Sequence, residues 1–323
     1  MSRPQGATTR PVRVRGLRLG HATSPGGQTG VTVALFRPPA AVVVDVRGGA
    51  SCTYDTASLS VDATFGRRWA LFFAGGSVQG LDAARGIRTA LLSAGAGQRP
   101  FLNPNRIVQV SGATLFDLPA VAGPITDYLP LGFGAATEAV GSRVAVGRIG
   151  AGAGATVGKY LGRSRAMAGG LGYASGRVPS MGATGALVVL NSVGAVRNES
   201  RGTWIAGARG PNGRVVPPNA AGRPPRVSRD LPRGTNLVLV VTEAPLDRSG
   251  LQRLAQQAHD GLARAVVPAH TATDGDVVFA ASTAASARPT RERYPGALAD
   301  RVGSLAAGLV ARAAVVAVRP NGA

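Results

Sequence analysis

The stretch GTNLVLVVTEAP, from Gly234 to Pro245, marks an abrupt return to order in a chain of 323 residues. Its leucines and valines predict a β-strand that begins at the threonine. The segment before it, residues 198–234, is dominated by glycine, proline, arginine and asparagine, and only TWIAG within it has a strand-like pattern. A loop of this length is unusual in a compact domain and is typically disordered, functional or both. We therefore expect a flexible loop that ends at a strand.

Strand-like and helix-like segments alternate on both sides of this loop. Downstream, the pattern predicts an amphipathic helix at residues 249–266, a strand at 276–283 and a long helix at 296–318. Upstream, it predicts strands at 30–36, 40–46, 70–76 and 184–191, and helices at 77–94 and 131–140. This order indicates an α/β fold. The C-terminal unit is either a second domain or part of the same sheet, with the loop as a processing site.

The composition is strongly basic, with 36 lysines and arginines and a formal net charge of +20. The basic residues are spread along the chain and form no block, so we do not favour nucleic acid as a partner. Cys52 is the only cysteine, which excludes a disulfide within the chain. The three histidines lack ligand spacing, and we expect no metal and no cofactor. No apolar segment follows the basic N-terminus, so we expect a cytoplasmic protein without a membrane partner.

Lys159 is the only lysine, and it lies in the glycine-rich run GAGAGATVGKY, residues 150–160. The run resembles a phosphate-binding loop but lacks two of its residues, since Ala153 replaces the first glycine and Tyr160 replaces the serine or threonine. We therefore do not expect a nucleotide site. Unlike arginine, a lysine readily shifts its pKa when it is desolvated or near other charges. Lys159 is either a tunable cation in a site or a lysine retained by chance.

The pair Gly234–Thr235 lies at the junction of the loop and the strand and has two interpretations. Thr235 is either an ordinary strand residue or an N-terminal nucleophile that cleavage of the preceding peptide bond releases. The new α-amine, with an ordinary pKa of about 8, would then act as general base for the hydroxyl of the same residue. Gly234 would suit a strained scissile bond, because glycine tolerates unusual backbone angles.

The segment HTATDGDVVFA, residues 270–280, places Asp274 and Asp276 two residues apart at the start of a predicted strand. An Asp-Gly turn that leads into a strand is one explanation. The other is a carboxylate pair that holds an ammonium group and orients a hydroxyl. Asn191 ends an earlier strand and offers an amide donor, whereas His259 lies on the amphipathic helix and is expected to be structural.

In their order and spacing, these segments resemble the L-aminopeptidase/D-esterase family, which includes β-peptidyl aminopeptidases and nylon-oligomer endo-hydrolases. The resemblance covers nearly the whole chain, from GHATSPGGQTGVTV through GAGAGATVGK and GALVVLNSVGAV to AHDGLARAVVPAHTATDGDVVFA. It implies one hydrolase domain over residues 1–323 with the four-layer α/β/β/α sandwich of DmpA-like N-terminal-nucleophile hydrolases. It also implies self-cleavage into residues 1–234 and 235–323, with 198–234 as a flexible processing loop.

The same resemblance implies a role for each candidate residue. Thr235 would be the nucleophile, with its α-amine as base, and Asn191 would donate to the oxyanion. Lys159 would lie beside the threonine hydroxyl, and the acidic pair Asp274 and Asp276 would position that lysine and the new amine.

The chain departs from the family pattern at three of its positions. Gly234 stands where asparagine is usual, and Asn236 where a second threonine or serine is common. Phe116 replaces a tyrosine near the substrate.

We therefore predict a self-processing amide hydrolase, an aminopeptidase that acts on small peptides or amino-acid amides. An endo-amidase on linear, nylon-type polyamide oligomers is the alternative within the class, because loops and neighbouring subunits set the pocket. An uncut, non-catalytic binding protein with the same fold is the alternative outside it, and the three departures keep it open. Family analogy also implies a homo-oligomer, a tetramer.

Overall fold

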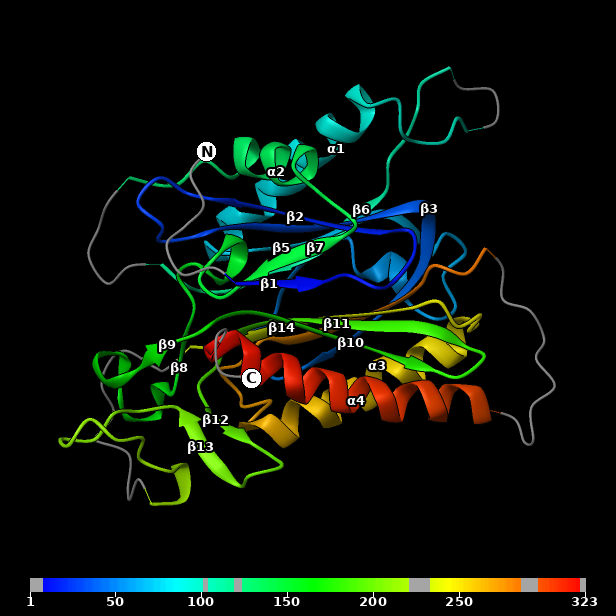
Figure 1. The fold of residues 1–323 in the computed structure, drawn as a ribbon. Coiled ribbons are helices and arrows are strands. Elements are labelled where there is room, and N and C mark those ends of the chain that lie inside the picture. Colours follow the sequence, from blue (N-terminus) through cyan, green and yellow to red (C-terminus); the bar gives the residue numbers. More distant parts are fainter. Residues whose placement is uncertain (1–7, 101–103, 119–123, 221–232, 286–295, 320–323) are drawn as a thin grey trace.

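The computed structural model describes residues 8–100, 104–118, 124–220, 233–285 and 296–319. Within these ranges the chain forms four layers, which Figure 1 shows from the side. Two helices cover one sheet, a second sheet packs against the first, and two further helices cover the second sheet. The helices are α1 Ala83–Ser93, α2 Tyr128–Thr137, α3 Arg248–Ala265 and α4 Ala297–Val318.

The two sheet layers are joined in one hydrogen-bonded network with the strand order β10-β11-β14-β16-β3-β5-β6-β4, and β2 pairs with β3. The strands are β2 Leu17–Thr23, β3 Gly30–Arg47, β4 Cys52–Tyr54, β5 Arg67–Ala74, β6 Val110–Thr114, β10 Gly170–Val178, β11 Gly182–Asn191, β14 Thr235–Thr242 and β16 Asp276–Ser282. Short outlying strands are β1 Thr8–Pro11, β7 Arg143–Val146, β8 Thr156–Val157, β9 Met167–Ala168, β12 Ala195–Asn198, β13 Thr203–Ala206 and β15 Val266–Val267.

Strand β3 connects the two layers because it is long enough to belong to both. Its first half pairs with β2 and β5, and its residues 41–47 pair with β16. The register with β5 shifts between Leu35 and Ala40, around Pro38 and Pro39, which supply no ladder donors. The expectation of two separate strands here was wrong, because the backbone stays extended through the prolines and finds a new partner beyond them.

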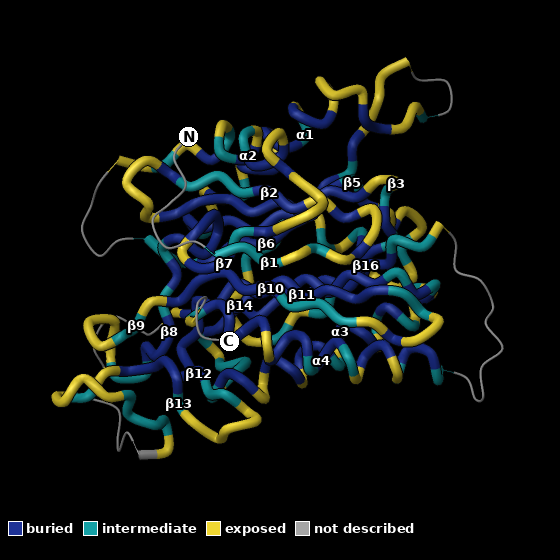
Figure 2. The backbone as a smooth tube through the Cα atoms, viewed as in Figure 1, coloured by how far each residue is buried: buried dark blue, intermediate teal, exposed yellow. Residues whose placement is uncertain are grey.

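Three hydrophobic cores fill the spaces between the four layers, and buried residues follow the strands (Figure 2). Phe72 and Ile87 belong to the core beneath α1 and α2. Phe279 lies in the core between the two sheets. Val238 and Leu254 belong to the core beneath α3 and α4. Successive residues of a strand point to opposite faces, so the continuous apolar run of β14 serves two cores at once.

The long helix α4 is a core helix. It is long and apolar enough to cross a membrane by those two criteria alone, but 61% of its apolar window is buried inside the protein. It packs on α3 and across β10 and β11. The predicted amphipathic character of α3 is confirmed, since its apolar residues Leu251, Leu254, Ala258 and Leu262 are all fully buried.

The segment that the sequence marked as a loop contains some regular structure. β13 consists of TWIA and pairs with β12 in the antiparallel direction, so the chain reverses direction between these two strands. Residues 221–232 lie outside the described residues, so the flexibility of 198–234 stays a prediction. After this segment, β14 lies between β11 and β16. The C-terminal β-α-β-α unit therefore shares its sheet with upstream strands.

Candidate active site

The candidate nucleophile begins the central strand β14. Thr235 is the first residue of that strand and is 3% exposed. Its partner in the antiparallel ladder is Asn191, the last residue of β11. On the other side, Gly234 forms a bridge with Asp274 just before β16 begins. The sheet therefore brings together four of the predicted site residues from distant parts of the sequence.

The peptide bond before Thr235 is held by hydrogen bonds on both sides. The Gly234 carbonyl accepts the Thr235 hydroxyl at 2.5 Å and the backbone N–H of Gly275 at 3.1 Å. The Gly234 N–H donates to the Thr273 carbonyl at 3.1 Å. Two donors on one carbonyl oxygen polarise the carbonyl and place the hydroxyl beside it. The Gly275 N–H was missed by sequence reasoning, because a backbone donor leaves no side-chain signal beyond the Asp-Gly turn.

Lys159 is buried beside this strand pair, with 2% of its surface exposed. Its ammonium donates to the Asn191 carbonyl at 2.7 Å, to Asn191 Oδ1 at 2.9 Å and to the Thr156 carbonyl at 2.9 Å. Burial lowers the pKa of Lys159 to about 7, and the nearby charge of Asp274 offsets part of that effect. A pKa in this range is what a group needs to transfer protons near neutral pH. Asn191 contacts both Lys159 and Thr235, and the expected place of the ammonium beside the threonine hydroxyl stays a prediction.

In the uncut chain, the side chain of Asn191 forms hydrogen bonds with other groups of the protein. Its Oδ1 accepts from Lys159 and from the Thr156 N–H at 3.0 Å, and its Nδ2 donates to the Phe116 carbonyl at 2.9 Å. The amide thus ties Lys159 to Phe116 across the end of β11. Its role as oxyanion donor stays a prediction, because it requires the Nδ2 group to leave the Phe116 carbonyl.

The two carboxylates of the acidic pair are fully buried and face different partners. Asp274 accepts from the Val193 N–H at 3.2 Å and from the Thr271 hydroxyl at 2.8 Å. Burial, and then the charge of Asp276, raise the pKa of Asp274. Asp276 accepts from the backbone N–H of Asn236 at 2.8 Å. Asp274 acts on Lys159 through charge alone, and Asp276 holds the residue after the nucleophile.

Phe116 lies at the edge of this site, between two cationic groups. The guanidinium of Arg163 is 5.9 Å from its ring centre and that of Arg233 is 5.2 Å away. Arg233 immediately precedes Gly234, so a side chain from the acyl side of the peptide bond before Thr235 contacts the ring. The place expected for Phe116 near a substrate stays a prediction.

The comparison with known proteins identifies the family. A model of peptidase family S58 matches residues 12–320. The chain belongs to peptidase family S58. It is therefore a hydrolase of that family, and the non-catalytic alternative loses its support.

Relatives of this S58 chain carry two kinds of name. A protein of Mycobacterium tuberculosis named as an uncharacterized aminopeptidase is 34% identical over 326 residues, which is 94% of this chain and 92% of the relative. A 6-aminohexanoate-oligomer endohydrolase of a Kocuria species is 30% identical over 308 residues, which is 93% of this chain and 81% of the relative.

Solved structures confirm the predicted fold of the S58 chain. The L-aminopeptidase D-Ala-esterase/amidase of Ochrobactrum anthropi, described as a variant of the N-terminal-nucleophile hydrolase fold, aligns with a TM-score of 0.64 at 20% identity. The alignment covers 97% of this chain and 88% of that one. At this identity the likeness shows the fold alone.

The unusual glycine of this S58 chain has a steric explanation. A Cβ atom on Gly234 would lie 2.1 Å from Asp274 Oδ1 and 2.6 Å from the Val193 nitrogen. Gly234 is not among the residues with a positive φ angle. The suitability of Gly234 for a strained scissile bond stays a prediction, and the close approach of Asp274 gives a steric reason for glycine here.

A third carboxylate near the S58 site, that of the half-buried Asp117, escaped the sequence reasoning. Asp117 follows Phe116 and accepts from the Gly76 N–H at 2.7 Å. Burial raises the pKa of Asp117, and the charge of Lys159 lowers it. A lone aspartate in a loop carries no sequence signal that distinguishes it from a surface residue, so only the fold could reveal it.

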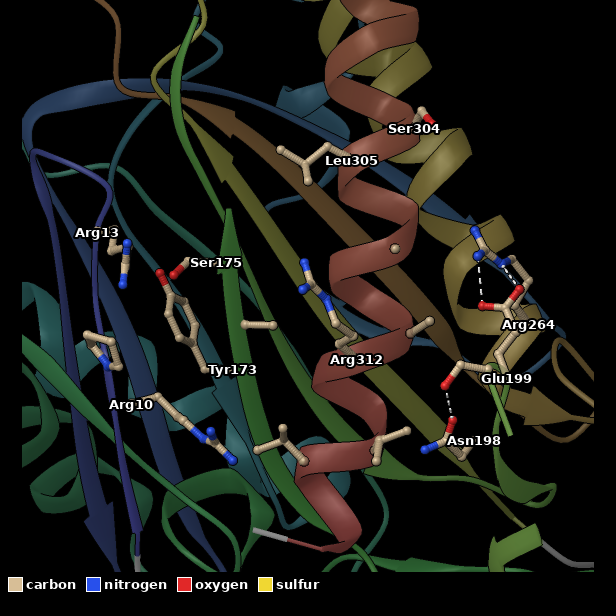
Figure 3. Close-up of a pocket in the computed structure, with 17 residues that line it drawn as sticks. Arg10, Arg13, Tyr173, Ser175, Asn198, Glu199, Arg264, Ser304, Leu305 and Arg312 are labelled. Carbon is tan, nitrogen blue, oxygen red and sulfur yellow. Dashed lines mark hydrogen bonds and ion pairs between the residues drawn. The ribbon is translucent and has the colours of Figure 1, made fainter. Parts of the chain in front are cut away.

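Two further observations bear on ligands of the S58 site. Among the described residues, no group of three or more His, Cys, Asp and Glu side chains could hold a metal ion. A cavity of 790 Å³ lies between β10 and α4, where Arg13 and Arg312 project beside Tyr173 (Figure 3). None of the predicted site residues lines that cavity.

Proposed function

We propose that this S58 chain is a self-processing amide hydrolase with Thr235 as its nucleophile. The observation that carries the proposal is the Gly234 carbonyl, which accepts both the buried Thr235 hydroxyl and the Gly275 N–H. The nucleophile and a polarising donor are thus already in place on the one peptide bond whose cleavage would free the amine of Thr235.

The proposed self-cleavage is an N-to-O acyl shift. The Thr235 oxygen attacks the Gly234 carbonyl carbon, and the negative charge that develops on the carbonyl oxygen is stabilised by the Gly275 N–H. The C–N bond breaks, the hydroxyl proton passes to the leaving nitrogen, and an ester joins Gly234 to Thr235. Water then hydrolyses the ester. The products are residues 1–234 and 235–323, and the second chain begins with a free α-amine.

The same threonine would then act on external amides. Its α-amine, with an ordinary pKa of about 8, takes the hydroxyl proton as the oxygen attacks the substrate carbonyl. An acyl-enzyme forms, the amine product leaves, and water releases the acid. Lys159 donates a hydrogen bond to Asn191 Oδ1, and the charge of Asp274 stabilises its ammonium form. Its lowered pKa near 7 suits it to donate or accept a proton at this step.

We propose small peptides or amino-acid amides as the substrates, with release of the N-terminal residue. The aminopeptidase name of the mycobacterial relative supports this choice. Endo-hydrolysis of linear polyamide oligomers is the second candidate, because the Kocuria relative carries that name. A cytoplasmic location remains a proposal from the sequence pattern of the N-terminus, and a homotetramer remains a proposal from the family resemblance.

Intact-mass measurement of the purified chain under denaturing conditions tests the proposal, with Thr235→Ser and Thr235→Ala as matched variants. We expect two fragments from the wild type and the serine variant, the smaller beginning at residue 235. The alanine variant should remain whole. A single uncut wild-type chain, or cleavage of the alanine variant at the same bond, contradicts the mechanism. Assays of amino-acid amides against 6-aminohexanoate oligomers then separate the two substrate classes.

A further inference from the structure

His270 makes the closest contact with the acidic pair outside the predicted site residues. Its Nδ1–H donates to Asp276 Oδ2 at 2.7 Å, and its backbone N–H donates to the same oxygen at 3.0 Å. The other oxygen of Asp276 accepts the backbone N–H of Asn236 at 2.8 Å and its side-chain Nδ2 at 2.9 Å. One buried carboxylate thus joins His270 to the residue that follows Thr235.

The segment that carries His270 also holds the other side of the candidate nucleophile. Residues 270–276 supply the Thr273 carbonyl and the Gly275 N–H that hold Gly234. They also supply Asp276, which holds Asn236. The position of Thr235 is therefore set by one short segment that contacts both of its chain neighbours, and His270 is the residue with which that segment begins.

The backbone of His270 is in an uncommon conformation. Its φ angle is +57°, in the left-handed region that non-glycine residues rarely adopt. Its backbone and side-chain donors both bind Asp276 Oδ2, which explains how the conformation is held. Such conformations persist where the surrounding structure determines them strongly, and they gather at functional sites.

A second histidine, His259, packs against the ring of His270. His259 of α3 is fully buried, and the two rings meet edge to face with centres 4.7 Å apart. His259 Nε2–H donates to the Asp45 carbonyl of β3 at 3.1 Å and lies 3.3 Å from Asp45 Oδ1. The interaction of His259 with the Asp45 carboxylate lowers the pKa of Asp45. The groups that face His270 are thus Asp276 from β16 and His259 from α3.

We propose that His270 is a positioning residue for the Thr235 nucleophile, acting through Asp276 and Asn236. The proposal rests on the proposed function of Thr235 and adds a residue to its site. His270 does not touch the reacting atoms. Its side-chain donor fixes the carboxylate of Asp276, and that carboxylate fixes the start of β14 against the segment that polarises Gly234.

Two matched variants of the full chain separate the donor from the backbone conformation. His270→Asn keeps a side-chain N–H for Asp276, and asparagine tolerates the left-handed conformation. His270→Gly accepts the same conformation but has no side-chain donor. In a time course of cell-free synthesis, we expect the asparagine variant to cut itself within about threefold of the wild-type rate. We expect the glycine variant to be slower by about tenfold or more, because a hydrogen bond to a charged group is lost.

Hydrogen exchange provides a readout that does not depend on cleavage. In the uncut Thr235→Ala background, the Asn236 N–H is protected by Asp276. His270→Gly should speed its exchange by about tenfold or more, and His270→Asn should leave it close to the parent rate. Equal exchange and equal cleavage in the two variants would overturn the role of the His270 side chain. A wild-type chain that stays uncut contradicts the function proposed for Thr235, and the exchange result then still decides whether His270 positions β14.

Discussion

Asn191 and Thr235 face each other across the ladder between β11 and β14, as the last residue of one strand and the first of the other. Asn191 also binds the only lysine of the chain through both its backbone carbonyl and its Oδ1. One residue pair of the β-ladder therefore connects the candidate nucleophile to the buried lysine. The lysine reaches the threonine through the asparagine, so changes at any of the three should affect the others.

Replacing Lys159 with methionine should slow self-cleavage by about a hundredfold or more, the scale of losing an electrostatic contribution inside a site. Methionine fills similar space but carries no charge and no proton. The matched control is Arg165→Met, which removes a solvent-exposed cation a few residues along the same segment. The rate of appearance of the fragment beginning at residue 235 measures the effect. Wild-type cleavage in the methionine variant would mean that Lys159 is a structural residue only.

The pKa of Lys159 also predicts how stability depends on pH. It is lowered from 10.5 to about 7 by burial, so between these values the unfolded chain binds more protons than the folded one. The free energy of unfolding should therefore rise as pH increases from about 7 to 10, by on the order of a few kcal/mol. Urea denaturation in the uncut Thr235→Ala background measures this slope.

The control for that slope is Lys159→Met in the same background. The difference between the two chains isolates the contribution of the lysine, because the other titrating groups are shared. Asp274 does not mimic it, since its raised pKa gives a slope of opposite sign. Identical pH profiles would show that the lysine is charged at neutral pH in the folded chain.

The sequence was sufficient to predict the elements that carry the site. The apolar run after Gly234 predicted β14, and the Asp-Gly turn predicted the start of β16. These features are local, so residue order alone reveals them. The resemblance to a known family supplied the four layers, which local patterns do not specify.

What the sequence could not reveal depends on contacts between distant segments. The Gly275 N–H on the Gly234 carbonyl is a backbone contact and has no residue signature. His259 looked structural on its helix, and its contact with His270 arises only when α3 packs against the sheet. The steric reason for Gly234 likewise requires the position of Asp274.

Gly234→Ala should disturb the site through its added Cβ atom. That atom would lie 2.1 Å from the Asp274 carboxylate, so the strand start or the acidic segment must move. In the uncut Thr235→Ala background we expect a loss of about 1–3 kcal/mol in the free energy of unfolding. The matched control is Gly308→Ala on α4, where no atom lies within 4 Å of the added Cβ.

That control should be neutral or slightly stabilising, because alanine favours a helix over glycine by about 1 kcal/mol. Urea denaturation of the two variants side by side gives the comparison. In the wild-type background, the Gly234 variant should also cut itself about tenfold more slowly or worse, since a small displacement at a reacting centre costs much in rate. Equal stability of the two alanine variants would contradict the packing argument for Gly234.

Phe116→Tyr should separate self-cleavage from turnover of external substrates. In the uncut chain Phe116 contributes its backbone carbonyl to Asn191, which a tyrosine would retain, so self-cleavage should stay within about threefold of wild type. The ring contacts the guanidinium groups of Arg163 and Arg233. On the family resemblance, which implies a place near the substrate for this residue, an added hydroxyl supplies a hydrogen-bond donor to the substrate, and we expect kcat/KM on an amino-acid amide to rise by about tenfold or more.

The matched variant is Phe116→Leu, which keeps the backbone carbonyl and an apolar side chain but loses the aromatic ring. It should leave self-cleavage unchanged and lower turnover, because the cation–π contacts with Arg163 and Arg233 are lost. Fragment masses report the first reaction, and steady-state kinetics on the cut enzyme report the second. If the tyrosine variant slows both reactions together, the side chain of residue 116 maintains the structure of the site. Another residue must then supply the hydrogen-bond donor to the substrate.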